Sequence, residues 1–160
     1  QTGKMELLEA ESRRLESEGI LSAEERAALD LKTLADFWSS EAGRKIRGQA
    51  KRVRRELPFT AKFSPAEIST ITGTKADAGL ENEFVVVQGV ADLVALLPSE
   101  IWLVDFKTDQ ITAGELLRKT KFYTPQLKLY AAALEKIYAR PVANRWLHFL
   151  DARKTVEVKT

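Results

Sequence analysis

Two acids and a lysine interrupt neighbouring apolar runs in the segment 87–109, VQGVADLVALLPSEIWLVDFKTD. Side chains alternate along a strand, so Asp105 and Lys107 share one face of the second run with Leu103. Asp92 likewise shares a face of the first run with apolar neighbours. An ionised carboxylate in such surroundings is costly unless it is paired, hydrogen-bonded or bound to a cation. Two adjacent strands that bring these three side chains together predict a metal site for phosphodiester chemistry.

Several strands are needed to position these side chains. A turn-type cluster at residues 98–100 separates the two apolar runs and predicts a pair of neighbouring strands. A first strand is expected over residues 56–63, and a closing hairpin over 144–150 and 154–158. The only histidine, His148, lies within that hairpin, and a lone histidine in such a strand favours a structural role.

Helical patterns precede and follow the strands. Residues 4–18, 22–29 and 31–38 have helical composition or spacing, and the basic stretch 41–52 is expected to continue as helix. Together they predict a helical lead-in over residues 1–55 that caps a sheet-containing core over residues 56–160. A capping-box match at 64–67 competes with strand there, and residues 73–83 are expected to form an exposed loop.

A strong helix is predicted to begin at Thr124 and Pro125 and to continue to residue 139. Threonine caps helices well, and proline is tolerated at the first helical position. Gln126 and Tyr130 lie one turn apart on this helix. Taken alone, their spacing favours an exposed glutamine and a core tyrosine rather than a site.

The composition predicts one globular domain. The chain has 160 residues, of which 44% are hydrophobic and 30% charged, and no apolar run approaches the ~18 residues of a membrane span. Cysteine is absent, which excludes disulfides, thiolate zinc sites and cysteine-held iron–sulfur clusters. The sequence opens at Gln1 instead of methionine, so we expect it to be part of a larger protein.

Positive charge is concentrated in one segment. Residues 43–55 hold seven basic residues and no acid, although the whole chain has a net charge of only +2. This segment predicts a phosphate-binding stripe, with a solvated helix face as the alternative. The candidate DNA contacts are Arg44, Lys45, Arg47, Lys51, Arg52, Arg54 and Arg55, together with Arg118, Lys119 and Lys121 further along the chain.

Five motif elements occur in a fixed order: Glu56, Gly89-Val-Ala-Asp92, Asp105-Phe-Lys107-Thr108, Gln126 and Tyr130. An isolated Asp-x-Lys is weak, but this ordered set resembles the PD-(D/E)XK nuclease superfamily over most of the chain. More narrowly, it is similar to the nuclease domain that ends AddA- and RecB-type helicase–nucleases. The absence of cysteine favours the AddA side over relatives that hold an iron–sulfur cluster.

The resemblance implies an α/β fold with a central mixed sheet flanked by helices, preceded by a helical segment. It also implies that Asp92, Asp105 and the Phe106 backbone carbonyl bind Mg²⁺ or Mn²⁺, with Glu56 adding to the metal shell directly or through water. Lys107 would orient the attacking water or stabilise charge on the phosphorane. Gln126 and Tyr130 would position the substrate or that lysine.

The implied activity is metal-dependent hydrolysis of DNA, exonucleolytic in mode, within an ATP-dependent helicase–nuclease that processes double-strand breaks. The implied partners are DNA, helicase domains of the same chain and an AddB-like subunit, in the bacterial cytoplasm. The family pattern includes a histidine upstream of the first helix, which this sequence lacks and His148 does not match. The alternative hypothesis is a catalytically silent nuclease-fold module that binds DNA or a partner subunit.

Overall fold

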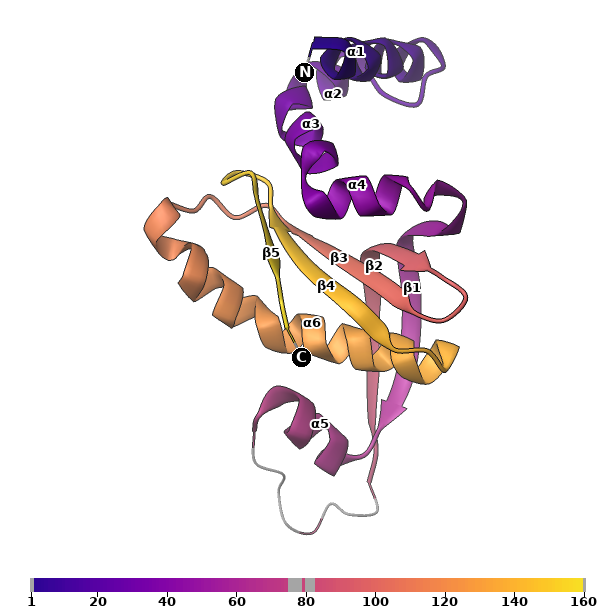
Figure 1. Cartoon of the computed structure of the whole chain (residues 1–160), viewed down its shortest axis with the longest axis vertical. Coiled ribbons are helices and arrows are strands. Elements are labelled where there is room, and N and C mark those ends of the chain that lie inside the picture. Colours follow the sequence, from indigo (N-terminus) through magenta and orange to yellow (C-terminus); the bar gives the residue numbers. More distant parts are fainter. Residues whose placement is uncertain (1, 75–78, 80–82, 160) are drawn as a thin grey trace.

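A five-stranded sheet in the order β1-β2-β3-β4-β5 forms the centre of the molecule, and helices cover both of its faces (Figure 1). This computed structural model describes residues 2–74, 79 and 83–159. Strands β3 and β4 are parallel, while the other neighbours are antiparallel. The strands are β1 (Val53–Phe63), β2 (Val85–Leu96), β3 (Ile101–Lys107), β4 (Val142–Phe149) and β5 (Lys154–Glu157). The predicted α/β fold with a mixed sheet is confirmed.

The helical lead-in comprises α1 (Thr2–Ser17), α2 (Ala23–Ala28), α3 (Leu31–Ser39), α4 (Glu41–Arg47) and the 3₁₀ turn η1 (Ala50–Arg52). The other helical elements are α5 (Pro65–Thr72), η2 (Ala113–Glu115) and α6 (Leu116–Tyr138). Complete capping boxes at Ser22 and Ser64 begin α2 and α5, as the sequence predicted. Among the described residues, no helix is both long and apolar enough to cross a membrane.

Two predicted boundaries were wrong. The last helix begins at Leu116, so Pro125 lies inside α6, and the Thr124 hydroxyl donates to the Thr120 carbonyl instead of capping. Proline removes one helical N–H, but buried residues of α6 such as Leu127 pack against the sheet and the helix continues. The basic helix ends at Arg47, and β1 already begins at Val53.

Part of one prediction cannot be compared with the structure. The expected loop at 73–83 includes residues 75–78 and 80–82, which lie outside the described residues. On either side of them, Gly73 ends α5 in the left-handed region with φ +74°, and β2 begins at Val85.

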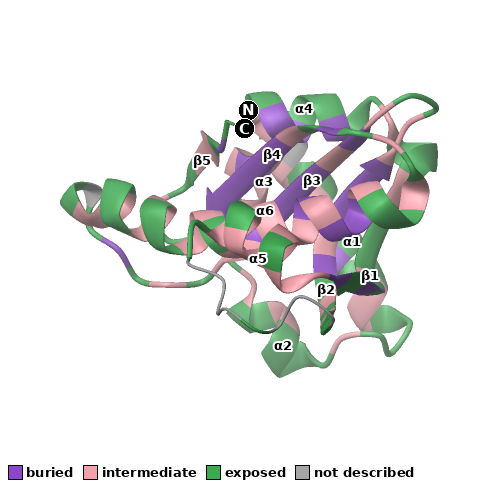
Figure 2. Cartoon of the chain, turned by 90° about the horizontal axis from the view of Figure 1, so that it is seen from below, coloured by how far each residue is buried: buried purple, intermediate pink, exposed green. Residues whose placement is uncertain are grey.

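The sheet separates two clusters of buried side chains. The larger cluster lies between the sheet and α6 and includes Leu103 and Leu147. The smaller lies between the sheet and the helices α3 and α4 and includes Val104, Trp146 and Phe37. Figure 2 shows buried residues along β3 and β4, the two strands at the centre of both clusters. The alternation predicted for β3 is therefore confirmed, with odd-numbered residues facing α6.

Candidate metal and phosphodiester site

Three carboxylates lie in one row across β1, β2 and β3. The β2–β3 ladder runs to the pair Leu93–Val104, and the next step in register places Asp92 opposite Asp105. The β1–β2 ladder skips one position, at which Glu56 lies opposite Asp92. Glu56 adopts φ +48° there, a left-handed conformation unusual within a strand. The sequence therefore aligns the three acids by strand register.

Asp105 is buried, with 4% of the residue exposed. Its Oδ2 lies 2.7 Å from Lys107 Nζ. That contact is an ion pair by distance only, because the same Oδ2 has no hydrogen-bond partner of good geometry among the described residues. Burial raises the pKa of the Asp105 carboxyl; Lys107 opposes this shift, and the charge of Asp92 adds to it. Asp105 thus has an oxygen that is buried and under-satisfied.

Lys107 is held on several sides by groups from α6. Its Nζ donates to Gln126 Oε1 at 3.0 Å and lies 4.2 Å from the ring centroid of Tyr123. Gln126 Nε2 in turn lies 3.3 Å from the Tyr130 hydroxyl, to which it donates. The structure therefore brings Gln126 and Tyr130 to the lysine, where the resemblance placed them, instead of leaving the glutamine exposed.

The glycine of the Gly89-Val-Ala-Asp92 motif allows this approach. A Cβ built on Gly89 would lie 2.7 Å from the Phe59 ring and 3.0 Å from Tyr130 Cζ. Phe59 and Tyr130 pack edge to face with ring centroids 4.8 Å apart. A side chain at position 89 would therefore displace the tyrosine that contacts Gln126.

A second network was missed by the sequence analysis. The Tyr123 hydroxyl donates to Asp109 Oδ2 at 2.7 Å, and Lys119 Nζ lies 2.5 Å from Asp109 Oδ1. These contacts, that of Lys119 first, lower the pKa of the Asp109 carboxyl, and Asp109 raises the pKa of Tyr123. One signal was available in the sequence, since Tyr123 precedes Gln126 by three residues and so lies on the same side of the helix.

Asp92 and the backbone of β3 complete the edge of the site. Asp92 Oδ2 accepts the Phe106 N–H at 2.7 Å. The Lys107 carbonyl points the other way and accepts the Leu150 N–H at 2.9 Å. Because carbonyls alternate in direction along a strand, the Phe106 carbonyl faces the side of β2, where Asp92 lies.

These donors suit a hard divalent cation. Carboxylate and carbonyl oxygens are the preferred ligands of Mg²⁺ and Mn²⁺, and the under-satisfied Asp105 Oδ2 is available to one. No group of three or more His, Asp or Glu side chains among the described residues has the spacing of a complete metal site. Glu56 is exposed, so the chain supplies two carboxylates at close quarters and a third at the rim.

A hollow of about 340 Å³ lies beside this edge of the sheet. Glu56, Asp92 and Phe106 line it from the strands, and Trp38 lines it from α3. Two acids of the carboxylate row, Glu56 and Asp92, therefore border a hollow on the side of the helical lead-in, whereas Asp105 does not line it.

The seven basic residues of the segment 43–55 are all exposed, on α4, η1 and β1. Lys45 is paired with Glu41 at 3.1 Å, and Arg118 on α6 with Glu115 at 2.6 Å. Lys121 is also exposed, whereas Lys119 is half-buried in the Asp109 network. Of the predicted DNA contacts, Lys119 is thus engaged by Asp109 in this structure.

His148 lies on the opposite face from Asp105 and Lys107. It is buried, its Nδ1 is 2.9 Å from Thr155 Oγ1, and the rings of Phe37 and Phe106 pack against it edge to face. Burial lowers the pKa of His148 to about 4. These surroundings support the structural role expected for this histidine.

Comparison with known proteins shows the class to which this fold belongs. The model of the PD-(D/E)XK nuclease superfamily matches residues 3–160, so the chain belongs to that superfamily. The five-stranded mixed sheet with flanking helices is consistent with the restriction-endonuclease-like fold of its members.

More specific relatives include proteins described as the A subunit of an ATP-dependent helicase/nuclease. The protein from Carboxydothermus hydrogenoformans is 34% identical over 151 residues, which cover 94% of this chain and 12% of that protein. The protein from Geobacillus kaustophilus is 33% identical over 153 residues, which cover 91% of this chain and 12% of that protein. This chain therefore spans about an eighth of the length of these relatives and is homologous to their nuclease part.

Among solved structures, the crystal structure of SSO0001 aligns with 92% of this chain and 59% of its own, at 14% identity and a TM-score of 0.38. This likeness is too loose to support an argument about the site.

Proposed function

We propose that this chain is a metal-dependent deoxyribonuclease domain that hydrolyses phosphodiester bonds of DNA with Mg²⁺ or Mn²⁺. The carrying observation is the alignment of Asp92 and Asp105 beside Lys107, in which one buried carboxylate oxygen has no hydrogen-bond partner among the described residues. A buried acid with a raised pKa beside a held lysine is typical of functional sites.

Asp92, Asp105 and the Phe106 carbonyl are the proposed ligands of the metal ion, with Glu56 at the outer edge. A bound Mg²⁺ supplies a water of lowered pKa and neutralises charge on the phosphate. Lys107 supplies a fixed positive charge for the developing oxyanion, and Gln126 keeps its Nζ in place through the 3.0 Å hydrogen bond. Tyr130 fixes the orientation of the Gln126 amide.

The biological setting follows from the relatives. Because their names describe one component of a helicase/nuclease, we propose that this domain is joined to helicase domains and works with an AddB-like partner in the bacterial cytoplasm. The proposed role is exonucleolytic processing of DNA ends during recombinational repair. DNA is the proposed substrate, held in part by the exposed basic segment 43–55.

Cleavage of labelled single-stranded and duplex oligonucleotides, with Mg²⁺, Mn²⁺ or EDTA, tests the activity. We expect products with either metal and none with EDTA. A mixture of end-labelled linear and closed circular substrates separates exonucleolytic from endonucleolytic cleavage. If DNA binds but is never cut under any metal condition, the alternative of a catalytically silent binding module replaces this proposal. The incomplete three-ligand site among the described residues is the observation that keeps this alternative in view.

DNA contact through the basic segment is tested by salt titration. Lys51→Gln combined with Arg52→Gln removes two exposed charges of η1. Since each neutralised phosphate releases counterions, the double variant should bind all sequences more weakly and its affinity should fall less steeply with salt. Lys32→Gln combined with Lys154→Gln is a charge-matched control outside the segment. An unchanged salt slope in the first variant would show that the DNA path lies elsewhere.

A further inference from the structure

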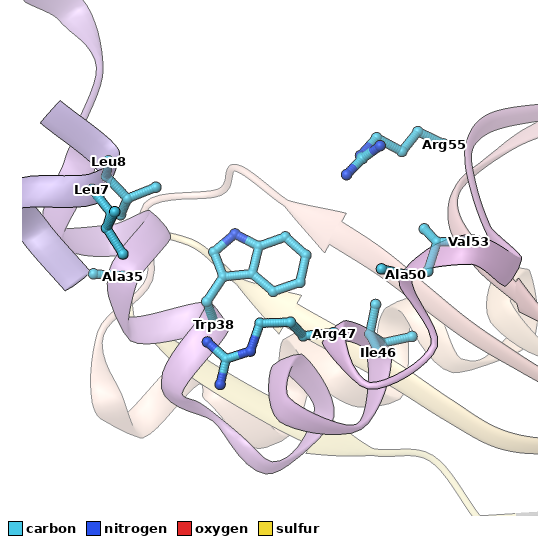
Figure 3. A pocket seen from close by; sticks show the side chains of 9 residues that line it. All are labelled: Leu7, Leu8, Ala35, Trp38, Ile46, Arg47, Ala50, Val53 and Arg55. Atoms are coloured by element: carbon cyan, nitrogen blue, oxygen red, sulfur yellow. The ribbon is translucent and has the colours of Figure 1, made fainter. Parts of the chain in front are cut away.

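An apolar groove lies between the helical lead-in and the start of β1. Its volume is about 290 Å³, and Leu8 from α1, Ile46 from α4 and Val53 from β1 contribute to its walls. Figure 3 shows the Trp38 indole projecting into the middle of this space, with Arg47 and Arg55 on either side of it. The groove thus combines an aromatic surface with two guanidinium groups.

This groove adjoins the hollow beside the carboxylate row. Trp38 and Arg55 line both spaces, so the two spaces are neighbours at these side chains. Arg55 immediately precedes Glu56, the acid opposite Asp92 in the strand register. A ligand in the groove would therefore lie next to a ligand at Glu56 and Asp92.

The charge around the groove favours a polyanion. Arg47 and Arg55 are exposed, and neither has an ion pair with any residue in the described ranges 2–74, 79 and 83–159. Both belong to the segment 43–55, which carries seven basic residues and no acid. An apolar protein segment would leave these cations without partners, whereas phosphates on either side of an aromatic base would meet them.

We propose that this groove is a nucleobase subsite, in which one unpaired base of a DNA strand stacks on Trp38 while its flanking phosphates contact Arg47 and Arg55. This inference rests on the proposed nuclease function and assigns it a preference for a single strand. Bases of a duplex are paired and stacked on one another, so they reach an aromatic side chain only when the strand is opened. The stacked base lies next to the phosphate presented to Asp92 and Asp105.

The test compares two fluorescently labelled decamers with the same number of phosphates: an oligothymidylate and a decamer with abasic sites throughout. Binding of the whole 160-residue chain is measured by anisotropy in EDTA, so that no cleavage occurs. Stacking of a single base is worth about 1–3 kcal/mol, so we expect the oligothymidylate to bind roughly tenfold more tightly than the abasic decamer. Equal binding of the two decamers by the wild-type chain would overturn the subsite.

Two variants test whether the base binds in this groove. Trp38→Leu keeps apolar volume but removes the aromatic face, and should bring the ratio of the two affinities close to one. Ala50→Leu narrows the groove from an exposed position without altering Trp38, and should lower the ratio as well. If neither folded variant lowers the ratio, the base binds elsewhere and the inference is wrong.

Arginine variants separate stacking from phosphate contact. Arg55→Gln and Arg54→Gln remove the same charge from neighbouring exposed residues, but only Arg55 lines the groove. Arg54→Gln should weaken both decamers alike, whereas Arg55→Gln should also reduce the ratio. Because these measurements need no metal and no turnover, they separate the two hypotheses. A base preference without cleavage would support the subsite and contradict the nuclease, and cleavage without a base preference would do the reverse.

Discussion

On both faces of β3, burial disfavours the charged form of a titratable side chain, an acid on one face and a base on the other. On the α6 face, burial raises the pKa of the Asp105 carboxyl; on the other face, burial lowers the pKa of His148, which is Asp105's near neighbour across the β3–β4 ladder. In each case the uncharged form is favoured. The two faces differ in what surrounds the group, since a lysine lies beside Asp105 and aromatic rings surround His148.

This difference separates a functional polar group from a structural one. Lys107 on β3 is connected by polar contacts to Gln126 and Tyr130 of α6, a long helix that packs along the sheet. The other face is covered by short helices, and its hollows are walled mainly by apolar side chains. The long helix thus supplies polar partners to the charged groups of β3, whereas the short helices border the hollows.

The largest expected effect comes from substitutions of charged residues on the α6 face of the sheet. Asp105→Asn and Lys107→Met should each reduce DNA cleavage on the order of 1,000-fold, because the first removes the charge of a proposed metal ligand and the second removes the positive charge beside the reacting phosphate. The rate of product formation at saturating Mg²⁺ is the measurement. Without metal, Asp105→Asn should leave the free energy of unfolding unchanged or raise it, since the buried acid is disfavoured in its ionised form.

Matched surface variants make that result specific. Glu24→Gln on α2 and Lys32→Met on α3 remove exposed charges of the same kinds, away from the site, and should cleave like the wild type. Wild-type cleavage by Asp105→Asn would remove that acid from the proposed site. A large loss of stability in the same variant would instead show that the Asp105–Lys107 pair holds the fold together.

The histidine on the other face should govern stability in weak acid. His148 titrates near 6.5 in the unfolded chain and at about 4 in the fold. Between these values only the unfolded chain binds the proton, so stability is full above 6.5 and is lost as the pH falls to 4. The loss should reach about 3 kcal/mol. Urea unfolding at several pH values measures it, and His148→Gln should flatten the slope.

Asp105 acts in the opposite direction to His148. Because its folded pKa is raised, the native state binds its proton more tightly and gains stability as the pH falls through that pKa. On acidification, the His148→Gln variant should therefore lose less stability than the double variant that also carries Asp105→Asn. Equal losses in the two variants would show that Asp105 does not contribute.

The sequence predicted the strand-borne part of the site because strand alternation is a strict two-residue period. Asp105 and Lys107 lie on the face expected, and the break at residues 98–100 puts Asp92 in register with Asp105. The helix-borne part was predicted less well. Without the family resemblance, Gln126 is an exposed polar residue, since its partner Lys107 lies 19 positions earlier in the sequence.

Two errors have a common physical cause. Thr124 and Pro125 favour a helix start, and proline disfavours a helix interior, but packing of α6 against the sheet outweighs that local preference. The helix expected over residues 41–52 ends at Arg47 and is followed by the 3₁₀ turn η1, and β1 begins at Val53 instead of residue 56 because it pairs with β2 from there. Tertiary pairing decided both boundaries, and no local pattern reports it.

Metal binding should stabilise the α6 face and leave the other face unaffected. At about ten times the dissociation constant, Mg²⁺ or Mn²⁺ adds about 1.4 kcal/mol by mass action, which raises Tm by roughly 3–6 °C in a chain of this size. Thermal unfolding in ~10 mM metal against equal ionic strength of KCl measures this. Asp92→Asn keeps an acceptor for the Phe106 N–H but loses the charge, so its shift should vanish.

Ca²⁺ separates metal binding at this site from metal-supported cleavage. It binds oxygen ligands with looser geometry, so it should raise Tm without supporting cleavage. Chelation with EDTA should return the wild-type Tm to that of the metal-free protein. An equal shift in Asp92→Asn and wild type would place the ion outside the carboxylate row.

The smallest expected effect concerns the network that the sequence analysis missed. The Tyr123 ring lies over Lys107 Nζ, and Asp109 fixes the hydroxyl of that tyrosine. Tyr123→Leu removes the ring and should lower kcat about tenfold, since a cation over an aromatic face is worth about 1–2 kcal/mol in a shielded site. Tyr123→Phe keeps the ring and should lose less activity, and Asp109→Asn should behave similarly.

DNA affinity should be unchanged in all three variants, because these residues position Lys107. Phe84→Leu, at an exposed aromatic residue just before β2, is the matched control. If Tyr123→Leu and Phe84→Leu have the same kcat, the Tyr123 ring does not position the lysine, and Gln126 alone holds it in place.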